Sequence, residues 1–170
     1  MTLIELLLVV AILGIISMFI IPNLLDSLQK AKQKRSMTDI NGVGLAWMNW
    51  LTDEASAAAA GSQHTHDFTA SLPATLTSDE LFQTLYVSSR LFYAKIVPKT
   101  DGWGNDYDYR WAGELTKPHL LGIRSYGRDK VVGPTTEPYP AGAFVGTYYD
   151  QDIVWADGFF IRFPRGAQVN

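Results

Sequence analysis

The chain begins with an almost uninterrupted run of apolar residues. Between Leu6 and Ile21 the only hydroxyl belongs to Ser17, and no residue is charged. As a helix, residues 1–21 would span about 31 Å at roughly 1.5 Å per residue, which matches the hydrocarbon core of a bilayer. We therefore predict a helix that spans a membrane or is buried in an assembly. A signal peptide is less favoured, because a basic n-region and a small-x-small cleavage site are both missing. A core helix would need protein on every side.

Glu5 lies near the start of this run. An ionisable group in such a segment is costly and is usually functional where it occurs. A buried carboxylate needs a partner, and the apolar run contains no cation. The sequence therefore indicates that a group outside this span compensates Glu5.

After Pro22 the pattern becomes one-sided. Apolar positions recur at spacings of three and four, as on one face of a helix, at Leu24, Leu25, Leu28, Ile40, Val43, Gly44, Trp47, Trp50 and Leu51. The helix is predicted to continue to about residue 52 and to fray by about residue 60. Proline lacks the amide that bonds one turn back, so a kink or break is expected just before Pro22. Gly14 weakens the helix further.

The chain thus divides into a hydrophobic helix at 1–25 and a globular domain at 26–170, which opens with an amphipathic helix at 26–55. Three pieces of the β-region at 100–165 are rich in β-formers, namely 107–111, 120–126 and 153–163. Three antiparallel strands packed against the long helix would bury both apolar faces. The predicted fold class is α+β.

Two local signals fill the intervening segments. Thr77 and Glu80 have the spacing of a capping box, which introduces a short helix through residue 91. A loop of about 25 residues separates the last two predicted strands, and loops of that length tend to be functional or held by something specific.

Composition excludes several functions. The 170 residues carry a formal net charge of −3 and a pI near 5.5, which offers no basic face for nucleic acid. Without cysteine there is no disulfide, thiolate metal site or cysteine nucleophile. There is no nucleophile elbow or phosphate-binding glycine loop. The pair His64 and His66, in a loop of small polar residues, is too weak a pattern to indicate a metal. We predict that the protein is not an enzyme.

Acidic residues gather at the two ends of the long loop, at Asp129, Glu137, Asp150 and Asp152. Calcium takes six to eight oxygen ligands, so one ion could close such a loop in a chain without disulfides. The alternative is that these acids are ordinary turn residues, and spacing alone favours it.

The segment TLIELL at residues 2–7, followed by Gly14 and Pro22, resembles the mature N-terminus of the type IV pilin superfamily. The family has a glutamate fifth from its N-terminus, then an apolar run and a proline at position 22. Met1 departs from the usual phenylalanine, which is N-methylated after cleavage by prepilin peptidase. The resemblance implies a modified N-terminus at Met1.

Three further segments resemble major pseudopilins of type II secretion systems. DGWGNDY at 101–107 is similar to their D-P-W-G-N-x-Y, SYGRD at 125–129 to their S-x-G-x-D turn, and DQDI at 150–153 to their D-x-D-I segment. In that family, acids of the last two segments hold calcium, which implies a site at Asp129, Asp150 and Asp152. Gly102 replaces the motif's proline, and Lys130 replaces the usual glycine.

The resemblance implies a subunit of a helical filament. The subunit would be extracted from the bacterial inner membrane by an assembly platform and polymerised through its N-terminal helix into a periplasmic or extracellular homopolymer. Glu5 would pair with the N-terminal amine of Met1 in a neighbouring subunit, and the stretch from Gly14 to Pro22 could melt. Whether the fibre would serve secretion or another purpose is left open.

A second hypothesis is a monomeric, membrane-anchored binding protein. Its loop at 131–151 carries four aromatic residues that could contact a saccharide or peptide, namely Tyr139, Phe144, Tyr148 and Tyr149. The same four rings could instead cover the core or contact the next subunit.

Overall fold

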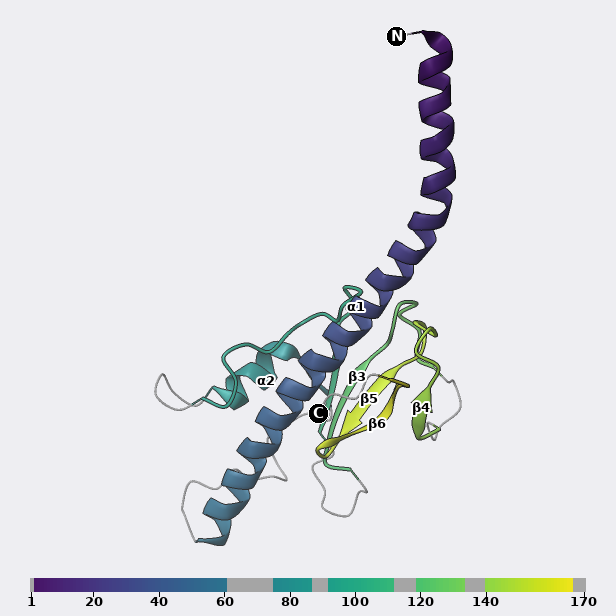
Figure 1. Ribbon diagram of the computed structural model, residues 1–170. Helices are drawn as coiled ribbons and strands as arrows, with labels where there is room; N and C mark the ends of the chain where they lie inside the picture. The colour runs from purple at the N-terminus through teal and green to yellow at the C-terminus, as the bar shows by residue number, and fades with distance from the viewer. Residues whose placement is uncertain (1, 61–74, 87–91, 112–118, 134–139, 167–170) are drawn as a thin grey trace.

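A computed structural model describes residues 2–60, 75–86, 92–111, 119–133 and 140–166. Its main element is helix α1, Leu3–Ala59, which runs without interruption through 57 residues and contains Pro22. We call residues 3–25 the stem. The helix axis bends between the stem and the part of α1 that lies on the sheet (Figure 1). The predicted helix is thus confirmed and reaches Ala59, and it is not melted between Gly14 and Pro22 in this single chain.

The second half of α1 buries one face. The buried positions recur every three or four residues, at Gln33, Ser36, Met37, Ile40, Val43, Gly44, Trp47 and Trp50. This spacing places them along one side of the helix, as the sequence pattern predicted from Ile40 onward. Leu24, Leu25 and Leu28, the start of the predicted stripe, are instead exposed in this chain. Leu45 points the other way and is exposed.

Helix α2, Ser78–Leu85, begins with the predicted capping box. The Glu80 amide donates to Thr77 Oγ1 at 3.3 Å, and the Thr77 amide donates to Glu80 Oε2 at 2.7 Å. Leu81 and Leu85 are one turn apart and are both buried in the core. The helix was predicted to reach residue 91 but ends at Leu85, with Tyr86 as its C-cap, and residues 87–91 lie outside the described residues.

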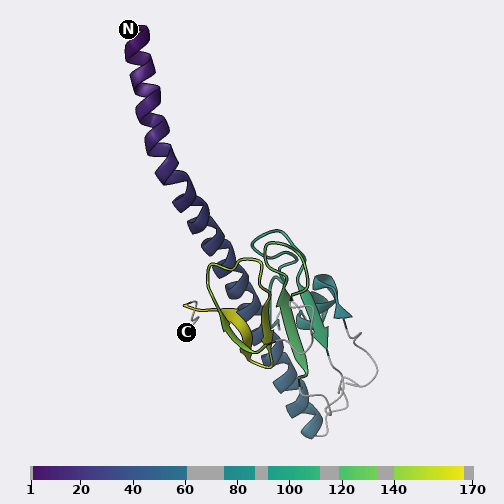
Figure 2. The same cartoon turned by 90° about the vertical axis from the view of Figure 1, so that its right-hand side faces the viewer.

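The sheet has six strands in the order β1-β2-β3-β5-β6-β4. Their bounds are β1 Thr75–Leu76, β2 Asp108–Trp111, β3 Leu121–Ser125, β4 Gly142–Phe144, β5 Ile153–Ala156 and β6 Phe159–Pro164. Helix α1 covers one face of this sheet, and the stem projects beyond it (Figure 2). The α+β class is confirmed, while the prediction of about three strands is too low.

The predicted strand at 153–163 is in fact a hairpin. Asp157 and Gly158 form its turn with φ of 48° and 105°, a left-handed conformation that an Asp-Gly pair adopts readily. The Asp157 carboxylate also accepts the amide of Leu121 at 2.8 Å, which ties the turn to β3. The continuous run of β-formers concealed this turn signal.

The sheet is also mixed rather than wholly antiparallel. Strand β4 lies within the predicted loop and pairs with β6 in parallel. Arg162 of β6 supports it, since the guanidinium donates to the Pro140 carbonyl at 3.0 Å and lies 5.5 Å from the ring centroid of Phe144. No local signal predicts this pairing, because its partners are about 20 residues apart along the chain.

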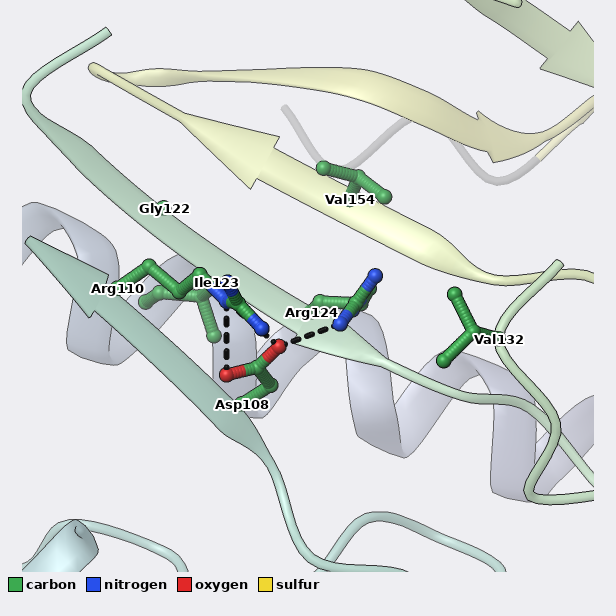
Figure 3. Close-up of a pocket in the computed structure, with 7 residues that line it drawn as sticks. All are labelled: Asp108, Arg110, Gly122, Ile123, Arg124, Val132 and Val154. Carbon is green, nitrogen blue, oxygen red and sulfur yellow. Dashed lines mark hydrogen bonds and ion pairs between the residues drawn. The ribbon is translucent and has the colours of Figure 1, made fainter. Parts of the chain in front are cut away.

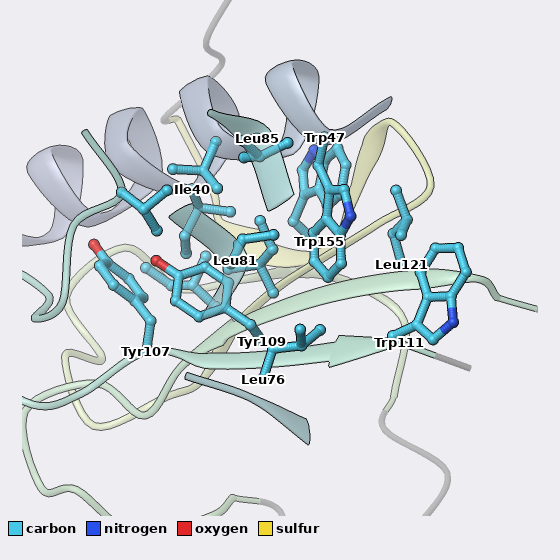
Figure 4. Packing of buried hydrophobic residues seen from close by; sticks show 14 of the residues in the cluster. Ile40, Trp47, Leu76, Leu81, Leu85, Tyr107, Tyr109, Trp111, Leu121 and Trp155 are labelled. Carbon is cyan, nitrogen blue, oxygen red and sulfur yellow. The ribbon is translucent and has the colours of Figure 1, made fainter. Parts of the chain in front are cut away.

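The core lies between α1, α2 and the inner face of the sheet (Figure 4). Trp47 of α1 and Trp155 of β5 are fully buried, and Trp47 stacks on Trp111 with ring centroids 6.3 Å apart. Trp155 lies directly against Gly44, where a Cβ atom would come within 2.5 Å of the indole ring. Gly44 therefore sets how closely the helix approaches the sheet.

We expect Gly44→Ala to destabilise the fold by about 1–3 kcal/mol, because the buried Trp155 ring has no room to move away. Gly42→Ala is the matched control two residues away, where an added Cβ meets nothing within 4 Å. That change should stabilise the helix by up to about 1 kcal/mol. Thermal unfolding of both variants followed by circular dichroism measures the difference, and equal stabilities would contradict the packing.

Candidate assembly interface

The stem of α1 exposes apolar side chains on all sides. From Leu3 to Leu25 its large apolar residues are 47–85% exposed. Among the described residues, one helix is long and apolar enough to cross a membrane, and it is α1. Surfaces of this size are normally covered, by lipid or by protein. The stem is therefore the first candidate for an interface.

At the tip of the stem, Glu5 bonds to its own helix end. Its Oε2 accepts the amide of Thr2 at 2.7 Å, and the Glu5 amide donates to Thr2 Oγ1 at 3.4 Å. This is the reciprocal pattern of a capping box, which satisfies amides at the helix start. The sequence-based prediction missed this second capping box, although Thr2 and Glu5 have the same spacing as Thr77 and Glu80.

Within the described residues, the capping bonds bring no positive charge to Glu5. Among the described residues its carboxylate accepts hydrogen bonds from Thr2, whose amide and hydroxyl are both neutral donors. The stem supplies no cation. Met1, the predicted partner and modified residue, lies outside the described residues.

Gly14 and Pro22 lie in the exposed stem, and an added Cβ at Gly14 would meet nothing within 4 Å. Because Pro22 has no amide, the Met18 carbonyl loses the donor that it would normally have one turn further along the helix. Nearby, Asn23 Nδ2 donates to the Phe19 carbonyl at 3.2 Å. The helix from Gly14 to Pro22 is therefore weakened twice, by a missing backbone hydrogen bond and by a residue of low helix propensity.

The globular domain is fastened to α1 just beyond the stem. Tyr149 from the long loop donates to the carboxylate of Asp26. Trp103 Nε1 donates to Gln29 Oε1 at 2.7 Å. Burial, followed by the bond with Asp26, raises the pKa of Tyr149 to about 12. These contacts fix the direction in which the stem leaves the domain.

Asp101 organises the first pseudopilin-like segment and is buried. Its Oδ1 accepts the amides of Trp103 and Asn105, both at 2.9 Å, and its Oδ2 accepts the hydroxyl of Ser125 at 2.7 Å. Asn105 Nδ2 then donates to the Gly127 carbonyl at 2.6 Å. The segments at 101–107 and 125–129 therefore meet and support one another.

Gly102 shows why this chain lacks the motif's proline. Its amide donates to Ser36 Oγ at 2.9 Å, a bond that proline cannot make. A Cβ at this position would lie 2.2 Å from the carbonyl oxygen of Lys32. The loop therefore sits directly on the backbone of α1.

The three predicted calcium ligands do not form one cluster. Both oxygens of Asp150 accept from Arg128, while Asp129 Oδ1 accepts the amide of Val131 at 3.1 Å. Asp152 is buried, and its Oδ2 accepts the amide of Gly133 at 3.2 Å. Over the described residues, no three acidic or histidine side chains gather closely enough to hold a metal ion.

The three described aromatic residues of the 131–151 loop do not form a shared binding face. Phe144 is buried in the core cluster, and Tyr149 is buried against Asp26. Tyr148 is 60% exposed. Tyr139 lies outside the described residues.

The outer face of the sheet carries a hollow of about 380 Å³ (Figure 3). Its charged centre is Asp108, which accepts from Arg124 Nη2 at 2.6 Å and from Arg110 Nε at 3.0 Å. Gly122, Ile123, Val132 and Val154 complete the lining. Asp108 is buried, and its negative charge is balanced by Arg110 of the same strand, β2, and by Arg124 of the neighbouring strand, β3.

A comparison with curated proteins finds the type II secretion system core protein G of Vibrio cholerae serotype O1 (strain ATCC 39315 / El Tor Inaba N16961). The two are 30% identical over 161 residues, which cover 89% of this chain and 92% of that protein. The chain belongs to the major pseudopilin family of type II secretion systems. No family model and no solved structure matches it.

At the level of this family, the pseudopilin is a structural subunit of a pseudopilus. Membership of such a family agrees with the prediction that the chain is not an enzyme. Because the alignment covers 89% of this chain, the similarity includes most of the globular domain as well as the stem. The N-terminal residues alone could not show this.

Restoring the motif's proline with Gly102→Pro should destabilise this pseudopilin by at least about 2 kcal/mol, because it adds a clash and removes a hydrogen bond. Ser36→Ala adds no clash. It removes the bond from Gly102 and the bond from Ser36 Oγ to the Lys32 carbonyl, and it should cost about 1–2 kcal/mol. Chemical denaturation of both variants provides the comparison. A proline variant as stable as the parent would contradict the close approach to Lys32.

Proposed function

We propose that this pseudopilin is held in the bacterial inner membrane by its stem and is then polymerised through the same stem into a periplasmic or extracellular filament. The observation that carries the proposal is the exposed apolar surface between Leu3 and Leu25. Lipid can cover this surface before assembly, and neighbouring stems can cover it afterwards. The globular domain would then form the outside of the filament.

The chemistry of the stem explains why a polar contact is needed for register. Lipid tails are as apolar as leucine, so moving the stem from lipid to protein gains little hydrophobic free energy. Apolar packing alone also permits one stem to slide along another. A single charge pair placed at the tip would favour one register over the others.

Glu5 is suited to that role. In the single chain its carboxylate accepts only neutral donors within the described residues, so it can still accept a cation. We propose that this cation is the N-terminal amine of Met1 in a neighbouring subunit. Pairing would compensate two charges that are otherwise costly in an apolar environment.

The continuous helix between Gly14 and Pro22 could change on assembly. The missing backbone bond at Pro22 and the low helix propensity of Gly14 lower the cost of opening this stretch. We propose that it melts in the filament, which would let the fibre lengthen under load. Prepilin peptidase and an inner-membrane assembly platform are the further partners that the family implies.

The test replaces Glu5 by glutamine. Glu5→Gln keeps a side chain that can complete the capping box but removes the charge, whereas Glu5→Ala removes both. If the ion pair aligns subunits, both variants should lower the yield of sheared filaments by more than about tenfold, because the amine is left unpaired. Subunit levels in the membrane should stay unchanged.

Ser17→Ala is the control, since Ser17 Oγ donates only to the Leu13 carbonyl of its own helix at 2.7 Å. It should assemble normally. Normal filament yield from Glu5→Gln would refute the pairing and leave capping as the role of Glu5. The complete absence of fibres from the unaltered protein under electron microscopy would instead favour the monomeric binding protein.

A further inference from the structure

The long loop between β3 and β5 is closed by an ion pair, and we propose that Arg128 takes the place of the calcium ion that the family pattern implies. Arg128 Nε lies 2.8 Å from Asp150 Oδ1, and its Nη2 lies 2.8 Å from Asp150 Oδ2. This two-bond geometry is the strongest that arginine makes with a carboxylate. The pair joins positions 22 residues apart, at the two ends of the loop.

A backbone hydrogen bond aligns the same two ends. The Arg128 amide donates to the Tyr149 carbonyl at 2.8 Å, directly beside the ion pair. Gly127 also lies close to the backbone at Tyr149, because a Cβ there would meet the Tyr149 carbonyl oxygen at 2.8 Å. The side-chain pair therefore closes a junction that the backbone already brings together. The bond with Asp150 also raises the pKa of the Arg128 guanidinium.

The acids that would hold calcium are bonded to donors instead. Asp150 uses both oxygens for Arg128, and Asp129 accepts the amide of Val131. Asp152 accepts the amide of Gly133. A calcium ion requires six to eight oxygens turned toward one point, and within the described residues these carboxylates do not converge. The residues as arranged do not fit the ion.

The local charge also opposes a divalent cation. Arg128 and Lys130 flank Asp129 on both sides in the sequence. Three carboxylates and two cations leave one net negative charge, which is little attraction for a dication. Lys130 has a φ of 61°, which is the left-handed backbone conformation that glycine adopts most easily. The replacement of glycine by Lys130 thus adds a second cation beside the acids.

The consequence is a pseudopilin whose loop is closed without metal. A guanidinium supplies the positive charge from within the chain, so loop closure should be insensitive to the calcium concentration outside the cell. It should instead respond to ionic strength, because both partners are about half exposed.

The test is thermal unfolding of the full chain in detergent, which does not depend on filament assembly. Addition of calcium chloride or of the chelator EGTA should leave the melting temperature unchanged. Arg128→Ala and Asp150→Asn should each lower it by about 1–4 °C, and the double variant should be no worse than either single variant. Arg165→Ala, at another exposed arginine, is the matched control and should have no effect.

Two results would overturn the proposal. A fall in the melting temperature of the parent protein on chelation would show that calcium closes the loop. Additive losses in the double variant, or no loss from Arg128→Ala beyond that of Arg165→Ala, would show that the ion pair does not.

Discussion

The packing of α1 on the sheet is the interaction on which the rest of this structure depends. One helix of 57 residues serves two environments, since its first part is apolar on all sides and its second part is apolar on one. Trp155 against Gly44 sets the distance between helix and sheet, and Trp47 and Trp111 fill the space around that contact. Because the core fixes the second half of the helix, it also fixes the direction of the stem.

The pseudopilin motifs act as connectors between this helix and the C-terminal region. Asp101 holds its own turn and reaches Ser125, while Gly102 and Trp103 attach that turn to α1. Tyr149 makes a second attachment at Asp26. Glycine at the position of the motif's proline donates a hydrogen bond to Ser36 that proline could not make, so the departure from the family pattern has a structural reason in this chain.

Sequence reasoning succeeded where the determining interactions are local. The one-sided stripe of α1 and the capping box of α2 each depend on residues three or four positions apart. The capping box at Thr2 and Glu5 has the same spacing, but the apolar run that follows Glu5 points to its charge and not to its hydrogen bonds. Sequence reasoning also merged β5 and β6, because a run of β-formers hides a two-residue turn unless Asp157-Gly158 is recognised as one.

By itself, the sequence determined the long helix, its change from an all-round to a one-sided apolar surface, the α+β class and the anomaly of Glu5. Only the tertiary structure decided the six-strand order, the parallel pairing of β4 with β6 and the partners of the loop acids. Asp150 illustrates the reason. Its carboxylate suits a metal ion and a guanidinium equally well, and which one it meets depends on the fold bringing Arg128 to within 2.8 Å across 22 residues of chain.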